Sequence, residues 1–84
     1  MSMSEEVVLA EIRRVVEREL SLPHVVEGTH RLVDDLGLDS LTMTTLAVEL
    51  EDRFQIILSD PEAARVQTVA ELVRCVVERV GAAS

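Results

Sequence analysis

The sequence predicts an all-α fold, with three main helices and one short helix around a single core. Apolar residues recur at spacings of three and four over most of the chain, and helix-start signals precede the later segments. The length of 84 residues makes one small domain, residues 1–84, with no room for a second. A chain of this size buries only about 60% of the surface that its unfolded form exposes. Its core must be aliphatic, because Phe54 is the only aromatic residue.

The first helix is expected over about residues 4–20, and Pro23 ends any continuation. Its inward face repeats at helical spacing: Leu9, Ile12, Val16 and Leu20, with Val8 and Val15 beside them. A long loop follows over residues 21–39. A wholly solvated loop of this length would be unusual, so we expect its apolar residues to lie on the core: Val25, Val26, Leu32 and Val33.

The second helix is expected over about residues 40–53. Asp39 is a good N-cap, because its carboxylate can accept the free N–H groups of the following residues. Ser40 then lies exposed in the first turn, where unpaired N–H groups and the helix dipole favour an attached anion. This geometry suits a serine that carries a phosphate ester. The buried stripe is formed by Met43, Leu46, Ala47, Leu50 and Phe54.

Two further helices are predicted after an extended connection over residues 55–58, where an isolated strand would have no partner. Residues 59–62 form a helix start, with a cap residue, a proline at the first position and a glutamate three after the serine. They open a short helix of about residues 61–65. The last helix, about 69–80, begins with a capping box of Thr68 and Glu71 and has Gly81 as its stop. Its inward face comprises Val69, Leu72, Val73, Val76 and Val80.

The acidic residues concentrate in the middle of the chain. The chain contains sixteen acidic residues and eight arginines, which gives a net charge of −8. The segment from Leu32 to Glu62 contains eight of the acids and one arginine, Arg53, and has a net charge of −7. Such a segment repels nucleic acid, so we expect no nucleic-acid partner. Two readings of this charge remain open, a solvated surface and a docking surface for basic partners.

Cys75 is the only cysteine, which excludes an internal disulfide and a multi-cysteine metal site. It lies within an apolar helix and is best interpreted as a small core or boundary residue. We find no signal sequence and no apolar run long enough to span a membrane. The expected location is therefore the cytoplasm, without a membrane partner.

Residues 34–41, Asp-Asp-Leu-Gly-Leu-Asp-Ser-Leu, resemble the attachment motif of acyl carrier proteins. The segments 49–54 and 61–62, and the order and spacing of the helices, extend this resemblance over essentially the whole chain. It implies a four-helix bundle of the acyl-carrier-protein type with a covalent 4'-phosphopantetheine arm on Ser40, flanked by Asp39 and Leu41.

The resemblance also implies a monomer that carries cargo and performs no catalysis. A separate phosphopantetheinyl transferase would load the arm. Acyl- or aminoacyl-loading, condensing and transferase enzymes would then use the arm's thioesters in fatty-acid, polyketide, peptide or related biosynthesis. The arm acts as a flexible tether that raises the effective concentration of the cargo at each enzyme.

The second helix departs from the family in one respect. Much of the family carries acids in its first turns, whereas residues 41–48 of this chain carry no charge. Recognition by the basic patches of fatty-acid synthesis enzymes is therefore less favoured. Partner enzymes dedicated to a polyketide, peptide or specialised lipid pathway are correspondingly more favoured. Ile57, where the family often has a polar residue, is either an extra core anchor or a contact point. The expected recognition residues, neutral first and acidic second, are Thr44, Thr45, Val48, Asp34, Asp35, Glu49 and Asp52.

The sequence supports other functions less well. A small acidic helical adaptor that binds a partner through the second helix, and is never modified, is the main alternative. A hydrolase would need a base beside Ser40. The only histidines, His24 and His30, lie in the first loop without an evident orienting carboxylate, and Asp39 is occupied as a cap. Leucines interrupt any calcium-binding series over residues 34–49. We therefore expect no catalytic residue and no metal site.

Overall fold

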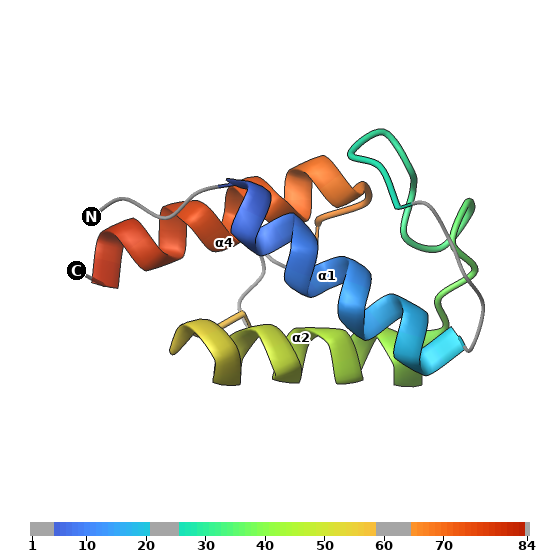
Figure 1. The fold of residues 1–84 in the computed structure, drawn as a ribbon, viewed down its shortest axis with the longest axis horizontal. Coiled ribbons are helices and arrows are strands. Elements are labelled where there is room, and N and C mark those ends of the chain that lie inside the picture. The colour runs from blue at the N-terminus through green and yellow to red at the C-terminus, as the bar shows by residue number, and fades with distance from the viewer. Residues whose placement is uncertain (1–4, 21–25, 59–64, 84) are drawn as a thin grey trace.

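A computed structural model of the chain describes residues 5–20, 26–58 and 65–83. In these ranges it contains three helices and no strand: α1 (Glu5–Leu20), α2 (Ser40–Phe54) and α4 (Val69–Ala83) (Figure 1). Each helix packs against the other two, and in Figure 1 α1 crosses the molecule between α4 and α2. The predicted all-α fold is confirmed.

Some expectations fall on residues outside the described ranges. They concern His24, Val25, the helix start over residues 59–62 and the short helix, whose residues 61–64 are not described. The connection after α2 is described: Gln55, the first residue of the expected extended segment, is instead the left-handed C-cap of α2, and residues 56–58 form neither helix nor strand. Ile56 and Leu58 are buried there, whereas Ile57 is 68% exposed and is therefore no core anchor.

The core is aliphatic, as the composition predicts. The expected stripes of the three helices supply most of it, three leucines and one valine of the first loop add to it, and Ile56 and Leu58 of the connection after α2 complete it. Phe54 is only half-buried at its edge. The buried residues are Val8, Ile12, Val15, Val16, Val26, Leu32, Leu36, Leu38, Leu46, Leu50, Ile56, Leu58, Val69, Leu72, Val73 and Val76.

The loop valine Val33 was expected on the core, and this was wrong, because it is 60% exposed. Backbone hydrogen bonds wind the chain into a helix-like turn here. The N–H of Leu36 donates to the carbonyl of Arg31, and the N–H of Gly37 donates to the carbonyl of Val33, each at 3.0 Å. In a coil of this kind residues four apart share a side. Leu32 and Leu36 therefore both point inward, and Val33 is rotated outward.

Gly81 was expected to end the last helix, and this was also wrong, because α4 continues to Ala83. A glycine ends a helix when it adopts a positive φ. Among the described glycines only Gly37 does so, with φ +70°, and Gly81 keeps helical backbone.

The first loop is attached to the beginning of α4. The N–H of Leu32 donates to Gln67, that of Val69 to His30 and that of Ala70 to Gly28, at 2.8–2.9 Å. The predicted capping box is present: the N–H of Glu71 donates to Thr68 Oγ1 and the N–H of Thr68 to Glu71 Oε1, both at 3.1 Å. These bonds fix the loop that leads into α2.

Candidate functional site

Ser40 is placed by the turn before it. Gly37 adopts φ +70°, a left-handed conformation that glycine reaches without strain. The next residue, Leu38, is 1% exposed and its N–H donates to the carbonyl of Leu32, so the chain is held to the core here. Asp39 is extended (φ −92°, ψ −178°), and Ser40 then begins α2 in an exposed position.

Asp39 is the N-cap of α2, as predicted. Its Oδ1 accepts the N–H of Thr42 at 2.8 Å, and its carbonyl accepts that of Met43 at 2.8 Å. Hydrogen bonding, chiefly from the backbone of Thr42, lowers the pKa of the Asp39 carboxyl below its ordinary value. The carboxylate therefore serves the helix and is not available as a base for its neighbour.

Ser40 is exposed to solvent at a helix N-terminus, where the dipole favours an anion, and its hydroxyl belongs to this exposed residue. Within the described ranges no side chain hydrogen-bonds to it. His30, the one described histidine, accepts the N–H of Glu27 through Nδ1 at 3.1 Å and so serves its own loop. This serine can be esterified by an enzyme that reaches it, but the described residues supply no base to activate it.

The residues that follow Ser40 on one face of α2 form what we call the outer stripe: Leu41, Thr44, Thr45 and Val48. Leu41 is 75% and Val48 55% exposed. The threonine hydroxyls turn back onto the helix: Thr44 Oγ1 donates to the carbonyl of Ser40 at 2.8 Å and Thr45 Oγ1 to that of Leu41 at 3.0 Å. The stripe is neutral and largely apolar.

The predicted recognition acids are mostly engaged with their own chain. Asp35 Oδ2 accepts the backbone N–H of Arg31 at 2.7 Å, and Asp34 lies 3.3 Å from the Arg31 guanidinium. Glu49 pairs with Arg18 of α1 at 2.9 Å, and Arg14 is 3.9 Å away. Asp52 is exposed, and no partner of its carboxylate occurs among the residues that the structure describes.

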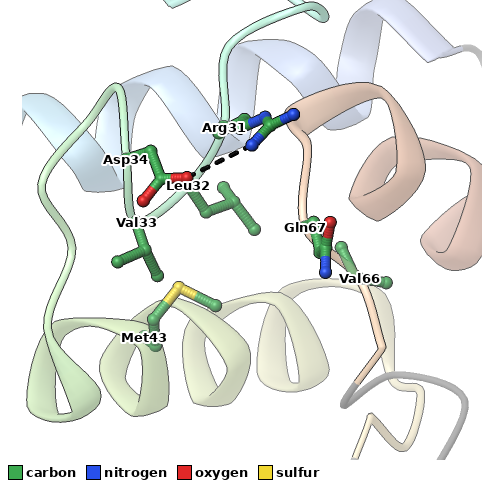
Figure 2. A pocket seen from close by; sticks show the side chains of 7 residues that line it. All are labelled: Arg31, Leu32, Val33, Asp34, Met43, Val66 and Gln67. Carbon is green, nitrogen blue, oxygen red and sulfur yellow. Dashed lines mark hydrogen bonds and ion pairs between the residues drawn. The ribbon is translucent and has the colours of Figure 1, made fainter.

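A pocket of about 240 Å³ lies between the first loop, α2 and the segment before α4 (Figure 2). Met43, three residues after Ser40, forms its wall on α2, and Arg31, Asp34 and Gln67 contribute polar groups. Three of its lining residues also line an inner apolar cavity of about 50 Å³: Leu32, Met43 and Val66. Sequence reasoning missed this pocket, because Met43 and Leu32 are signalled only as core residues.

Sequence reasoning also missed Glu11, which is 8% exposed and joins α1 to α2. Arg14 donates to its carboxylate, and the Arg53 guanidinium is 3.8 Å away. The hydrogen bond from Arg14 lowers the pKa of the Glu11 carboxyl below its ordinary value, against the opposing effect of burial. A signal existed, since position 11 shares a helix face with the buried Val8, Ile12 and Val15.

The described part of the chain contains neither a candidate metal site nor a membrane-spanning helix. Its side chains include no group of three that could hold a metal ion. None of its helices is both long enough and apolar enough to cross a lipid bilayer.

Comparison with known proteins identifies the family. The model of the phosphopantetheine attachment site matches residues 10–76. An acyl carrier protein of Wolinella succinogenes is 38% identical over 65 residues, covering 76% of this chain and 86% of that protein. One from Phenylobacterium zucineum is 37% identical and covers 89% and 96%. A meromycolate extension acyl carrier protein of Mycobacterium leprae is 31% identical, covering 87% and 64%.

A solved structure agrees with these relatives. A chain assigned as an acyl carrier protein of Mycobacterium tuberculosis superimposes with a TM-score of 0.72 at 33% identity, covering 90% of this chain and 97% of that chain. Members of the family are carriers served by a phosphopantetheinyl transferase and by biosynthetic enzymes, and 4'-phosphopantetheine is their covalent cofactor. The exposed serine at the start of α2 fits such an attachment, and the chain belongs to the acyl carrier proteins.

Proposed function

We propose that Ser40 is the attachment residue and that the chain delivers acyl or aminoacyl groups to loading, condensing and transferase enzymes. The pathway would be fatty-acid, polyketide, peptide or related biosynthesis. One observation carries the proposal: Ser40 is exposed as the first residue of α2, with no side chain of the described ranges engaging its hydroxyl. When bound, the cofactor supplies a terminal thiol that holds the cargo as a thioester.

Each neighbour of Ser40 has a distinct part in this proposal. Asp39 holds the beginning of α2 in place through Thr42, which positions the hydroxyl. The helix N-terminus stabilises the negative charge of a phosphodiester at Ser40. Leu41 lies beside the attachment point and is open to partner contact.

Partner enzymes are proposed to contact the outer stripe, defined above as Leu41, Thr44, Thr45 and Val48. Its position next to Ser40 supports this, because an enzyme that acts on the arm's cargo approaches this end of α2. Two acids in the loop before Ser40 and two in the second half of α2 are proposed to form the edge of the contact with the enzyme: Asp34, Asp35, Glu49 and Asp52.

The pocket beside Met43 offers a place for part of the cargo. Its inner cavity of about 50 Å³ is apolar but smaller than the roughly 150 Å³ that holds a benzene ring. This apolar part of the pocket therefore has room for only a small portion of an acyl chain. The choice of cargo is accordingly expected to depend mainly on the enzymes that load it.

Intact mass after incubation with coenzyme A and a broad-specificity phosphopantetheinyl transferase tests the proposal. We expect the mass to rise by one phosphopantetheine, and Ser40→Ala to abolish the addition. Thr29→Ala is the matched control, since it removes an exposed hydroxyl from the first loop and should leave the addition intact.

Addition to the Ser40→Ala variant would place the cofactor on another residue. No addition to the wild-type chain, by a transferase that modifies a reference carrier protein in the same assay, would contradict the proposal and favour an unmodified adaptor.

A further inference from the structure

We infer that Glu51 and Arg79 clamp the segment that follows α2 and thereby limit the length of the cargo that the protein can shelter. The inference deepens the proposed function and rests on a cargo attached through Ser40. It assigns both side chains as positioning residues, because they act through residues 56–58, which we call the strap.

The strap directs one side chain outward and two inward. Ile57 is 68% exposed, whereas Ile56 and Leu58 are 8% and 7% exposed. Leu58 lines the inner apolar cavity of about 50 Å³ that adjoins the pocket beside Met43. The position of the strap therefore determines the position of one wall of this cavity.

Two charged side chains from different helices hold the strap. The Glu51 carboxylate of α2 accepts the N–H of Leu58 through Oε2 at 2.8 Å. Arg79 of α4 donates through Nη1 to the carbonyl of Ile57 at 2.7 Å. Among the residues that the structure describes, one backbone hydrogen bond also reaches the strap, from the N–H of Ile56 to the carbonyl of Glu51 at 3.1 Å. We call Glu51 and Arg79 the clamp.

The other walls of the cavity are held by backbone hydrogen bonds. Four of its lining residues lie on α2 or α4, within the bonding pattern of a helix. Leu32 and Val66 lie on two segments that are joined where the N–H of Leu32 donates to the carbonyl of Gln67 at 2.8 Å. Leu58 is therefore the lining residue that can move with the least disruption of the bundle, and its outward movement enlarges the cavity.

A longer acyl chain needs this enlargement. The cavity of about 50 Å³ is smaller than the roughly 150 Å³ that holds a benzene ring, so a longer chain has to displace Leu58. Displacement of Leu58 breaks the hydrogen bond between its N–H and the Glu51 carboxylate. Loss of one hydrogen bond to a charged group changes such an equilibrium by about tenfold or more, so the clamp opposes the entry of long chains.

The test measures how well the loaded protein shelters its thioester. The phosphopantetheinyl transferase loads the chain from butyryl- or octanoyl-coenzyme A, and cleavage by hydroxylamine is followed by intact mass. Glu51→Ala should slow cleavage of the octanoyl form at least about fourfold relative to wild type, the gain from burying one more methylene. Cleavage of the butyryl form should stay within about twofold, because a short chain needs no displacement of the strap. Glu51→Gln keeps an oxygen that can accept the N–H of Leu58 and should behave as wild type.

Two further variants separate the clamp from the cavity. Arg79→Ala should slow cleavage of the octanoyl form as Glu51→Ala does. Its matched control is Arg74→Ala, which removes an exposed arginine of the same helix and should have no effect. Leu58→Ala enlarges the cavity directly and should slow cleavage with both clamp residues present. Circular dichroism checks that each variant is folded.

Amide hydrogen exchange on the unloaded chain gives a second readout. A guanidinium cannot accept a hydrogen bond, so Arg79 is not the partner of the Leu58 N–H. Exchange of this amide should nevertheless rise about tenfold in Arg79→Ala, because the strap opens more often.

Four outcomes would each overturn the inference. They are unchanged Leu58 exchange in Arg79→Ala, unchanged octanoyl cleavage in Glu51→Ala or in Leu58→Ala, equal effects of Glu51→Ala and Glu51→Gln, and equal effects of Arg79→Ala and Arg74→Ala. Failure of Ser40 to be loaded is seen separately, as an unchanged mass.

Discussion

The two faces of α2 carry similar side chains in opposite surroundings. On the inner face Leu46 and Leu50 are 1% and 0% exposed, whereas on the outer stripe Leu41 and Val48 are 75% and 55% exposed. The helix is the same and all four residues are aliphatic. Hydrophobicity alone therefore does not decide burial in this protein. The angle at which a residue leaves the helix, relative to α1 and α4, decides it.

The difference also separates stability from recognition. The inner face contributes to the core that all three helices share. The outer stripe is exposed at Leu41, Thr44 and Val48 and half-buried at Thr45, and it begins beside the exposed Ser40. A residue of the inner face should thus be needed for folding, and a residue of the stripe for contact with enzymes.

The largest expected effect comes from a pair of variants, one on each face. Leu50→Ala removes a fully buried side chain and should lower the free energy of unfolding by about 2–5 kcal/mol. Val48→Ala, on the outer stripe two residues away, should change it by no more than about 0.5 kcal/mol. Urea unfolding followed by circular dichroism measures both. Equal losses from the two variants would show that the faces are not distinct.

The division between the faces could largely be predicted from the sequence. The spacing of Leu46 and Leu50 placed the inner face correctly, whereas Phe54 of the same expected face is only half-buried. The absence of charge over residues 41–48 indicated the outer stripe. Asp39 was predicted as the cap because local chemistry determines a cap, and so was the Thr68–Glu71 box. Features that depend on near neighbours in the chain were therefore accessible.

Features that depend on contacts between distant parts of the chain could not be predicted from the sequence. Val33 was misplaced because the side of the loop that faces the core depends on how the loop pairs with the segment before α4, where the N–H of Leu32 donates to the carbonyl of Gln67. Glu49 was expected as a recognition acid, and its pairing with Arg18 follows only from the packing of α1 on α2. The pocket beside Met43 likewise requires the first loop, α2 and the segment before α4 together.

An intermediate effect on stability is expected from Glu11, the buried carboxylate of α1 that lies near Arg53 of α2. Glu11→Gln removes the carboxylate that Arg14 and Arg53 hold between α1 and α2. At neutral pH we expect a loss of about 1–2 kcal/mol, the worth of a hydrogen bond to a charged group, reduced because Arg14 and Arg53 are more than half exposed.

The pH dependence of this loss follows from the lowered pKa of the Glu11 carboxyl. In the unfolded chain this pKa is near its ordinary value of 4.5, so above that value the carboxylate contributes its full stabilisation. The contribution falls as the pH drops through the lower pKa of the folded state. Unfolding measured from about pH 6 to about pH 3 should show wild type and Glu11→Gln converging on acidification. A gap that persists or widens in acid would contradict the assigned role.

The smallest effect should come from replacing a stripe threonine by its apolar isostere. Thr44→Val keeps the volume and the helix propensity and removes only the hydroxyl that donates to the carbonyl of Ser40. Because that hydroxyl is used within the helix, the free energy of unfolding should change by less than about 0.5 kcal/mol. Transfer of phosphopantetheine should stay the same or rise slightly, since an apolar stripe becomes more apolar. Thr29→Val, on the exposed first loop, is the control for a general effect of threonine replacement. A marked fall in transfer by Thr44→Val alone would mean that the partner uses the hydroxyl, and the stripe would then be a polar recognition surface.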